Sequence, residues 1–374
     1  MAGYIFTLNS LESLKEIAQS GVYSTNLKIP QNTWGPHHEG TFADYLSMKA
    51  GDNVYFFHQR KIYGIGRLID VAGSCVHLNF PGADQPNSDS FNVLQNQMIL
   101  NDSTENLNNR FICTFEGGPF LFEKGVDMDE VLASQPAAFR MLRAFWKLSF
   151  VKIDDVENQA LFDYILKVNE DFINGNEGYF ERRDTIHRRI EQLHTPDYFA
   201  NSNEIVRAVV NGQKLGHEMA VEAAIIDYIS RQTANNIFGN WDYISHQVIA
   251  SPFKPIDYMD KMDVFGYRYI TGYRTISKYL MMELKKDAAN IEVINQAMKY
   301  VDWIEQEYSH DYSMIEAFVV ANDFSQEVID ERNTAARRFY TKGRTPAVTY
   351  EWTNLRLIQY TYNEVTGTLE FEEI

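Results

Sequence analysis

Apolar and polar residues follow one pattern in the first part of the chain and a different one after it. The stretch "GDNVYFFHQRKIYGIGRLIDV" has two apolar runs on either side of the polar turn His58 to Lys61, which predicts a β-hairpin. Together with "YIFTL" near the start, it indicates strands and turns for residues 1–125. From residue 126 to residue 200, apolar residues recur every three or four positions, in "MDEVLASQPAAFRMLRAFWKL" and "NQALFDYILKVNEDFI". That spacing predicts helices, so we expect a helical connector after a small, strongly curved sheet.

Residues 201–374 combine both patterns. A helix, several strands and a last hairpin, "LRLIQYTYNEVTGTLEFEEI", follow one another there. Such an order predicts a mixed sheet flanked by helices. The chain has 374 residues, which is more than one typical compact domain needs. We therefore predict an α+β or α/β chain of two domains, 1–125 and 201–374, joined by the connector 126–200.

An acid and a base interrupt an apolar run in "YLMMELKKDAANIEVINQAMKY", residues 279–300. Side chains alternate between the two faces of a strand, so Glu283 and Lys285 point the same way, about 6 to 7 Å apart along the strand. A solvated edge strand can show this pattern. The apolar residues immediately before Glu283 favour a buried strand end instead, where the two charges line a polar cavity.

A second acid begins another apolar strand nearby. Asp263 opens "DVFGYRYI", about twenty residues before Glu283. Acids on adjacent strand ends can share a hard divalent cation such as Mg²⁺, which takes a few carboxylate oxygens and keeps water and phosphate oxygens in its other positions. Lys285 can then orient or help to deprotonate that water and offset charge on the phosphate.

Helices on both sides of these strands carry further polar candidates. In "GHEMAVEAAIIDYISRQ", Glu222 shares an apolar stripe with three isoleucines, and Glu218 lies one turn earlier as the competing carboxylate. In "IEVINQAMKYVDWI", Gln296 and Tyr300 are four residues apart and can reach toward the same cavity or toward a nucleic-acid backbone. Each of these is also compatible with an ordinary helix surface.

The ordered set resembles the PD-(D/E)XK, or restriction-endonuclease-like, nuclease superfamily. It consists of a helix glutamate, an aspartate at a strand start, Glu-Leu-Lys at the next strand end and Gln-x-x-x-Tyr on the following helix, across residues 212–305. The Gln-x-x-x-Tyr element is similar to that of the RecB-like branch and of the mismatch and flap nucleases. One departure is that Met262 stands where the superfamily has the proline of its name.

The resemblance implies a role for each matched residue. Asp263 and Glu283 would bind the metal, with the Leu284 carbonyl as a third ligand, and Lys285 would position the attacking water. Glu222 would bind or polarise the metal or its water. Gln296 and Tyr300 would brace the site. The implied cofactor is Mg²⁺, which Mn²⁺ is expected to replace, and the implied reaction is phosphodiester hydrolysis that leaves a 5′ phosphate.

The first 125 residues resemble a different group of proteins. "MKAGDNVYFFHQRKIYGIGRLIDV" looks like the PUA-like β-barrels, in particular the EVE and YTH-type readers, which are associated with modified or flipped bases. Aromatic faces compensate for the unstacking of such a base. Trp34, in "QNTWGPHHEG", is the best aromatic candidate because the residues around it indicate a loop. A tryptophan that closes the end of the barrel is the alternative.

The end of the connector concentrates positive charge. "FERRDTIHRRIEQLH" contains Arg182, Arg183, Arg188 and Arg189 within two helical turns. Arginine forks match phosphate oxygens, so this segment is a candidate phosphate-contacting edge. A solvated helix face is the competing interpretation.

Composition narrows the function classes. The formal net charge of −17 argues against a broadly basic surface but leaves room for a local groove. The start lacks a secretory signal and no apolar run approaches the ~18 residues of a membrane span. Cys75 and Cys113 have no metal-ligand spacing, so we expect neither a disulfide framework nor a zinc site, and a cytoplasmic protein.

The sequence thus predicts a metal-dependent DNA endonuclease whose first domain selects modified or unusual DNA, as in restriction of foreign DNA. The alternatives are a non-catalytic reader of modified nucleic acid with a nuclease-like fold, and an RNA-directed PUA-like protein. The sequence leaves open which base or structure is recognised, the cut position, DNA against RNA, and whether two chains form a homodimer.

Overall fold

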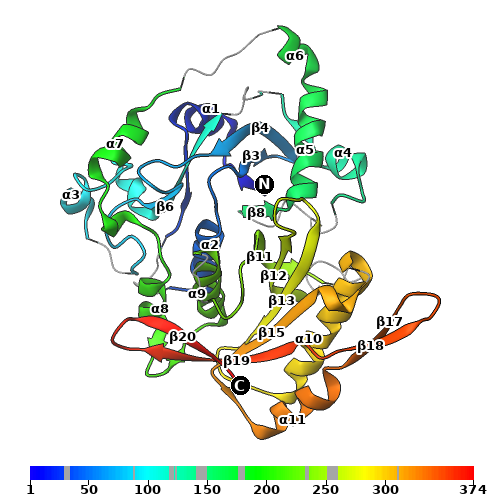
Figure 1. Ribbon diagram of the computed structural model, residues 1–374. Helices are drawn as coiled ribbons and strands as arrows, with labels where there is room; N and C mark the ends of the chain where they lie inside the picture. Colours follow the sequence, from blue (N-terminus) through cyan, green and yellow to red (C-terminus); the bar gives the residue numbers. More distant parts are fainter. Residues whose placement is uncertain are drawn as a thin grey trace. The chain divides into compact units, whose positions relative to one another are not determined.

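The computed structural model describes residues 1–28, 34–86, 89–117, 122, 124–139, 150–175, 182–231, 236–250, 260–309 and 311–374. The chain forms two compact units. Unit 1 comprises residues 1–33 and 48–201, and unit 2 comprises residues 34–47 and 202–374. Both units contain helices and strands, in agreement with a mixed α and β chain of two parts (Figure 1). The segment 34–47 belongs to the second unit although it lies within the first part of the sequence.

Unit 1 is built on one main sheet. Its strands run in the order β2 (Val22–Asn26), β6 (Asn109–Gly117), β4 (Lys61–Leu68), β3 (Asn53–His58), β1 (Gly3–Thr7) and β8 (Phe150–Ile153), with β5 (Val76–Leu78) beside β6 and β7 (Val126–Asp127) beside β4. The predicted hairpin at His58 to Lys61 is confirmed as β3 and β4. Gln59 and Arg60 have positive φ angles there, as a two-residue hairpin turn requires. Strands β2 and β8 are the two ends of this order, and within the described part of the chain they do not pair with each other.

The residues expected to form a separate connector belong to unit 1. The helices of this unit are α1 (Leu11–Ser20), α3 (Phe91–Leu94), α4 (Met128–Ser134), α5 (Asp155–Val168), α6 (Glu170–Gly175) and α7 (Thr185–Leu193), with 3₁₀ turns at Thr104–Asn108 and Pro196–Tyr198. Strand β8 pairs with β1, and apolar residues of α5 join the core beneath it. The sequence interpretation missed β8 because four residues are too few to show a strand period. Residues 140–149 of the expected helix lie outside the described residues.

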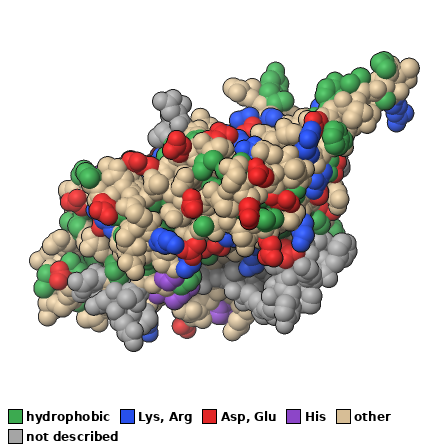
Figure 2. Space-filling view, turned by 90° about the horizontal axis from the view of Figure 1, so that it is seen from below, with side chains coloured by type: hydrophobic (Ala, Val, Ile, Leu, Met, Phe, Trp, Pro, Cys, Tyr) green, Lys and Arg blue, Asp and Glu red, His purple; other side chains and the backbone are tan. Residues whose placement is uncertain are grey.

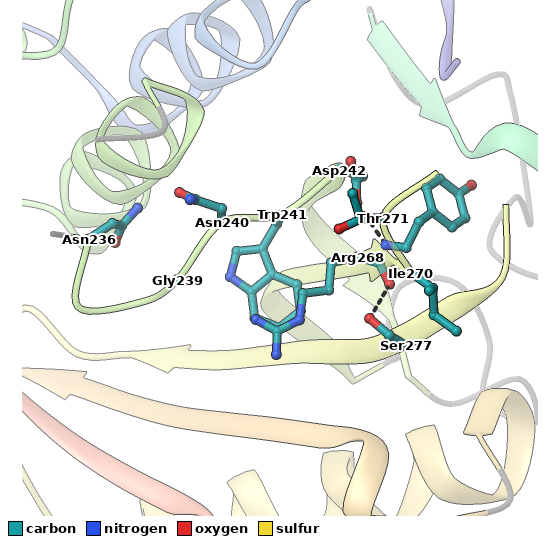
Figure 3. A pocket seen from close by; sticks show the side chains of 10 residues that line it. Asn236, Gly239, Asn240, Trp241, Asp242, Arg268, Ile270, Thr271 and Ser277 are labelled. Atoms are coloured by element: carbon teal, nitrogen blue, oxygen red, sulfur yellow. Dashed lines mark hydrogen bonds between the residues drawn. The ribbon is translucent and has the colours of Figure 1, made fainter. Parts of the chain in front are cut away.

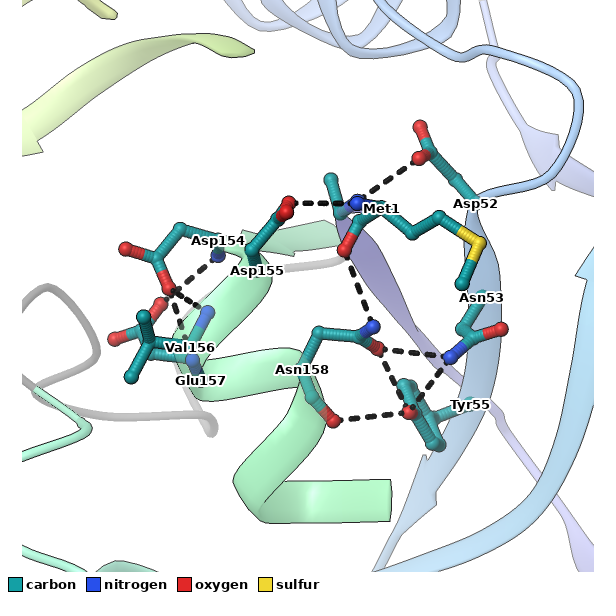
Figure 4. A network of polar contacts seen from close by, with 10 residues as sticks. Met1, Asp52, Asn53, Tyr55, Asp154, Asp155, Val156, Glu157 and Asn158 are labelled. Atoms are coloured by element: carbon teal, nitrogen blue, oxygen red, sulfur yellow. Dashed lines mark hydrogen bonds and ion pairs between the residues drawn. The ribbon is translucent and has the colours of Figure 1, made fainter. Parts of the chain in front are cut away.

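A buried polar network fixes α5 to the start of the chain (Figure 4). The side chain of Asn158 donates to the Met1 carbonyl at 3.2 Å and accepts from the Tyr55 hydroxyl at 2.8 Å. Asn53 donates to the same Asn158 oxygen at 3.2 Å. The amino group of Met1 pairs with Asp155 at 2.8 Å. Because these groups satisfy one another, α5 is an integral layer of unit 1.

Unit 2 contains a six-stranded mixed sheet. Its order is β11 (Tyr243–Ile249), β12 (Lys261–Tyr269), β13 (Ile276–Leu284), β15 (Ile315–Ala321), β19 (Leu355–Asn363) and β20 (Thr368–Glu373). The central strands β13, β15 and β19 are parallel, and the outer pairings are antiparallel. Short pairs are formed by β9 (Val210–Asn211) with β10 (Lys214–Leu215), β14 (Ala288–Ala289) with β16 (Asp323–Phe324), and β17 (Arg338–Lys342) with β18 (Val348–Trp352).

Helices cover both faces of this sheet. They are α2 (Pro36–Leu46), α8 (Asn203–Val209), α9 (Glu218–Ser230), α10 (Ile291–Ile304), which continues into a π-helical turn at Glu305–Ser309, and α11 (Gln326–Ala335), with a 3₁₀ turn at Tyr312–Met314. Apolar residues of α9 form one core with one face of the sheet, and α10 contacts β13 and β15. Within the described parts of the chain, no helix combines the length and apolar character needed to cross a membrane.

Helix α2 lies along α9, although about 170 residues separate them in the sequence (Figure 1). Gly40 permits a close approach, since a Cβ added there would meet Met219 Sδ at 3.4 Å. Glu39 is fully buried and its Oε1 lies 2.8 Å from His217 Nδ1. Because α2 covers one side of α9 and the sheet covers another, most of α9 is buried. The predicted single apolar stripe therefore understates how much of this helix is core.

Candidate active site

The strands of unit 2 bring Asp263 and Glu283 together. Leu280, Met282 and Leu284 pack in the core with α9, so strand alternation directs Glu283 to the face that α10 contacts. The antiparallel register of β12 and β13 pairs Val264 with Met282, which places Asp263 opposite Glu283. Oδ2 of Asp263 accepts a hydrogen bond from the Leu284 amide at 2.7 Å. The two acids thus occupy adjacent strand ends.

Both carboxyl groups are buried, and burial together with nearby negative charges raises their pKa values. Glu283 is 1% exposed and Asp263 is 8% exposed. Burial, then repulsion from Glu283 and Glu222, raises the pKa of Asp263 well above its ordinary value. Burial raises the pKa of Glu283 to about 7 although Lys285 opposes the rise. Oε2 of Glu283 is buried without a hydrogen-bond partner among the described residues, so one carboxylate oxygen remains available to a ligand.

Lys285 is the cation of the cluster. Its Nζ donates to Glu283 Oε1 at 2.7 Å and to the Leu284 carbonyl at 2.8 Å, and it lies 3.6 Å from Glu218 Oε1. Burial alone would lower the pKa of Lys285, but attraction to Glu283, then to Glu218, raises it. The side chain is therefore protonated near neutral pH, which favours orienting a water or phosphate over deprotonating the water.

Glu222 reaches the cluster from α9. It is 2% exposed, and its Oε1 accepts a hydrogen bond from Gln247 Nε2 at 2.6 Å. The same Gln247 nitrogen lies 3.4 Å from Asp263 Oδ1, so Gln247 bridges the helix carboxylate and the strand carboxylate. The side chain of Glu218 is 40% exposed, and its Oε1 lies 3.6 Å from Lys285 Nζ. Of the two glutamates, Glu222 is the one directed into the cluster.

Three residues of this region escaped the sequence analysis. Gln247 has a φ of 54°, an uncommon conformation for a residue other than glycine and one that often occurs at functional sites. His246 lies between Glu222 Oε2, at 3.3 Å from its Nδ1, and Asp44 Oδ1, at 2.8 Å from its Nε2. Burial would lower the pKa of His246, but attraction to Asp44 and Glu222 raises it to about 10. The "SHQV" pattern itself gives no signal for these contacts.

Gln296 and Tyr300 lie on α10. Gln296 Nε2 donates to the Tyr300 hydroxyl at 3.1 Å. Tyr300 is 4% exposed, and burial, with smaller contributions from Glu283 and Asp263, raises its pKa. The predicted pair therefore exists and lies near the carboxylates, where its hydroxyl stays protonated.

The donor set suits a hard cation. Asp263, Glu283 and the Leu284 carbonyl offer oxygen atoms only, and Mg²⁺ is commonly held by one or two carboxylates while it keeps several waters. Among the described residues, no group of three or more His, Cys, Asp or Glu side chains surrounds one metal position. Glu283 Oε2 has no hydrogen-bond partner among the described residues, whereas both oxygens of Glu222 and both oxygens of Asp263 already have protein partners. A cation at Glu283 would therefore replace existing hydrogen bonds of Asp263 or Glu222, and a ligand role of either stays a prediction.

The proposed base-stacking role of Trp34 conflicts with its position. Trp34 belongs to unit 2 and is 4% exposed. Its ring meets the edge of Phe42 at 4.9 Å between centroids. Gly35 is the N-cap of α2 and Pro36 is its first residue, so the Gly-Pro pair marks a helix start rather than a long loop. Trp34 is a core residue of unit 2.

The four arginines of the predicted phosphate edge have different surroundings. Arg182 pairs with Glu116 at 3.6 Å and Asp184 at 3.1 Å. Arg189 donates from Nε to the Met98 carbonyl at 2.7 Å. Arg183 is exposed, and the side chain of Arg188 is 72% exposed and 3.9 Å from Asp184. Two of the four therefore hold α7 against unit 1, and a phosphate contact of the other two stays a prediction.

A cavity of about 730 Å³ lies at the other end of β12 (Figure 3). It is lined by residues around the β12–β13 turn and the loop before β11, among them Trp241, Asp242, Arg268 and Ser277. Arg268 already pairs with Glu316 at 2.9 Å and lies over the Trp241 ring at 5.3 Å. No residue of the carboxylate cluster lines this cavity. The guanidinium of Arg268, which does line it, already has protein partners. The buried acids remain the stronger candidate for chemistry.

Comparisons with known proteins add little. No family model matches the chain, and no curated protein matches it either. One solved structure that it resembles is described as a crystal structure of a repair endonuclease from Pyrococcus abyssi, with 25% sequence identity and a TM-score of 0.16. The match covers 21% of this chain and 30% of that chain. An overlap of this size supports no conclusion about fold or function.

The geometry separates Glu222 from Glu218 in a testable way. We expect Glu222→Gln to lower the single-turnover rate of Mg²⁺-dependent DNA cleavage by about 10- to 100-fold, because it disturbs the contacts of Gln247 and His246. Glu218→Gln should lower the cleavage rate much less, because Glu218 is partly exposed and its contact with Lys285 is a long one, at 3.6 Å. A larger loss for Glu218→Gln would move the assignment by one helical turn.

The position of Trp34 predicts a stability effect. We expect Trp34→Ala to lower the free energy of unfolding by roughly 3 kcal/mol or more, measured by urea denaturation, because a large buried ring is removed. The matched control is Tyr273→Ala, whose side chain is 72% exposed. Unchanged stability together with weaker DNA binding would restore the base-stacking interpretation. A chain beginning at residue 126 would also lack α2, so it does not isolate an intact unit 2.

Proposed function

We propose that unit 2 is a metal-dependent nuclease that hydrolyses phosphodiester bonds of DNA at Asp263, Glu283 and Lys285. The observation that carries the proposal is the buried pair of carboxyl groups on adjacent strand ends, with an unpartnered oxygen on Glu283. The order of these residues along the chain, which resembles the PD-(D/E)XK superfamily, supports the same conclusion.

A purely structural role explains the cluster poorly. A buried carboxylate that lacks a full set of partners destabilises the fold, and two such groups side by side also repel each other. Lys285 pairs with Glu283 and also attracts Asp263, so its single charge offsets at most one of the two acids. A divalent cation between the two carboxylates would offset both the burial and the repulsion.

The residues divide the reaction among them. Mg²⁺ held by Asp263, Glu283 and the Leu284 carbonyl would supply Lewis acidity toward the phosphate. Lys285, as a cation, orients the attacking water and attracts the phosphate oxygens. Gln247 contacts the carboxylates of both Glu222 and Asp263 and so fixes their positions relative to each other. The water oxygen bonds to phosphorus and gives up one proton to solvent, while the bond from phosphorus to the 3′ oxygen breaks and that oxygen takes up a proton from solvent, which leaves a 5′ phosphate and a 3′ hydroxyl.

Unit 1 would select the substrate. Its β3–β4 hairpin carries the residues that resemble PUA-like readers of modified bases. In this proposal unit 1 recognises modified or unusual DNA, as in defence against foreign DNA, and unit 2 cuts it. The second candidate function is a non-catalytic reader with a nuclease-like fold, which the buried and mutually repelling acids disfavour.

Cleavage assays test the proposal. The full chain is incubated with unmodified and base-modified DNA in Mg²⁺, in Mn²⁺ and in EDTA. The proposal predicts cutting with either metal, no cutting in EDTA, and loss of cutting in Lys285→Ala. Binding of DNA without cutting across the whole panel and both metals would favour the reader.

A further inference from the structure

A two-stranded arm projects from unit 2 (Figure 1). It is formed by β17 and β18 and comprises residues 337–352, here called the β17–β18 arm. The two strands pair with each other and with no other described strand. The base of the arm is anchored, since Trp352 Nε1 donates to the Ile315 carbonyl at 3.0 Å and Arg338 Nε donates to Asp302 at 2.7 Å. The rest of the ribbon is largely exposed.

The arm differs from the rest of the chain in charge. Residues 337–352 contain four Lys and Arg residues and one acid, Glu351, in a chain that has 51 Asp and Glu residues. Figure 2 shows hydrophobic and basic side chains on the outer part of this projection. A net basic ribbon on an acidic protein is complementary to a polyanion.

The cations near the base and those near the tip have different partners. Arg337 pairs with Glu351, Arg338 with Asp302, and Lys342 with Asp311 at 2.6 Å. Arg344, at the tip, is exposed and has no hydrogen bond or ion pair with the described residues. Arg344 is therefore the cation most available to an incoming phosphate.

Aromatic rings lie between the cations. The side chain of Phe339 is 67% exposed and that of Tyr350 is 45% exposed. Tyr340 and Tyr350 stack at 5.8 Å between ring centroids, and Lys342 Nζ lies 5.5 and 5.8 Å from the two rings. Exposed rings of this size on both faces of a solvated ribbon are costly unless a partner covers them.

Ser313 links the arm to the sheet. Its carbonyl accepts a hydrogen bond from Lys278 of β13, and its hydroxyl accepts one from Lys342 of the arm at 3.1 Å.

We propose that the β17–β18 arm enters a groove of duplex DNA, with Arg344 on a phosphate and the exposed rings against the groove wall. The inference rests on the proposed nuclease function, because a polyanionic substrate is what makes duplex DNA the occupant. The major groove admits a two-stranded ribbon, and the arm is such a ribbon with Arg344 at its tip. A second copy of the chain fits less well, since Arg344 would need an acidic groove as narrow as the ribbon.

The test measures binding of the full chain to a short blunt DNA duplex and to a single strand of the same sequence, by fluorescence anisotropy in EDTA. Arg344→Glu should weaken duplex binding by about tenfold and reduce the slope of log affinity against log salt by about one. Duplex binding should be weaker still in the double variant that combines Arg344→Glu with Phe339→Ala. The matched controls are Lys15→Glu and Val93→Ala, an exposed cation and an exposed apolar residue of unit 1.

The outcomes separate this proposal from the nuclease proposal. Duplex binding that depends on the arm, without cutting in any metal, supports the arm and removes the nuclease function. Cutting by a wild type whose arm variants bind duplex normally overturns the arm proposal. Equal losses for single strand and duplex also overturn the groove assignment. Arm variants that change the sedimentation of the chain and leave DNA binding unchanged identify the arm as a contact between copies, which overturns it as well.

Discussion

Glu283→Gln is expected to abolish Mg²⁺-dependent DNA cleavage while the chain stays folded. The substitution keeps the size of the side chain but removes the charge that a cation and Lys285 need. Among the described residues, the interaction lost from the fold is the ion pair with Lys285, and the repulsion with Asp263 disappears at the same time. We expect the single-turnover rate to fall by at least about a hundredfold, since a buried charge of this kind acts directly on the transition state.

Two measurements test whether the loss of cleavage comes from the missing charge rather than from unfolding. Circular dichroism and thermal melting of Glu283→Gln should match those of the wild type, or show a higher melting temperature. Glu372→Gln, at an exposed position on β20, is the matched control and should cut at the wild-type rate. Full activity in Glu283→Gln would remove the carboxylate cluster from consideration.

The second large effect concerns stability as a function of pH. The pKa of Glu283 is about 7 in the folded chain, against an ordinary value of 4.5. Below about pH 4.5 the carboxyl is protonated in both the folded and unfolded states and contributes nothing. Between about 4.5 and 7 only the unfolded state is ionised, so the free energy of unfolding falls as the pH rises. The full loss, reached above pH 7, is on the order of 3 kcal/mol.

Urea denaturation of the metal-free protein at several pH values measures this slope. His77 titrates in an overlapping range, because burial lowers its pKa from 6.5 to about 4 in the folded chain. The informative quantity is therefore the difference between wild type and Glu283→Gln, in which distant contributions cancel. The difference should grow in favour of the variant from pH 4.5 to pH 7. A constant difference across that range would contradict a buried Glu283 carboxyl with a raised pKa.

The parts of the site that sequence reasoning predicted are the local ones. Strand alternation was enough to place Glu283 and Lys285 on one side, and the Nζ of Lys285 indeed lies 2.7 Å from Glu283 Oε1. The spacing of Gln296 and Tyr300 on one helix likewise predicted that they share a face, and in the structure the two side chains hydrogen-bond to each other, while their bracing role stays a prediction. Both follow from the period of a single element, which a sequence displays directly.

The parts that sequence reasoning missed depend on tertiary contacts. Asp44 reaches His246 only because α2 crosses into unit 2, and no periodicity within residues 34–47 indicates that exchange. Trp34 was misread because the Gly and Pro beside it indicated a loop, whereas Gly35 and Pro36 begin α2 and the Trp34 ring packs on Phe42 of that helix. Gln247 depends on a local φ of 54° that its neighbours in sequence do not predict.

Titration of the metal-free chain with Mn²⁺, followed by electron paramagnetic resonance, tests the central claim most directly. Bound Mn²⁺ loses its free-ion signal, so the measurement reports occupancy independently of cleavage. We expect one saturable site per chain, displaced by Mg²⁺, lost in both Glu283→Gln and Asp263→Asn, and retained in Glu372→Gln. Absence of saturable Mn²⁺ binding, or the same binding in wild type and Glu283→Gln, would contradict a metal-dependent nuclease site at these carboxylates.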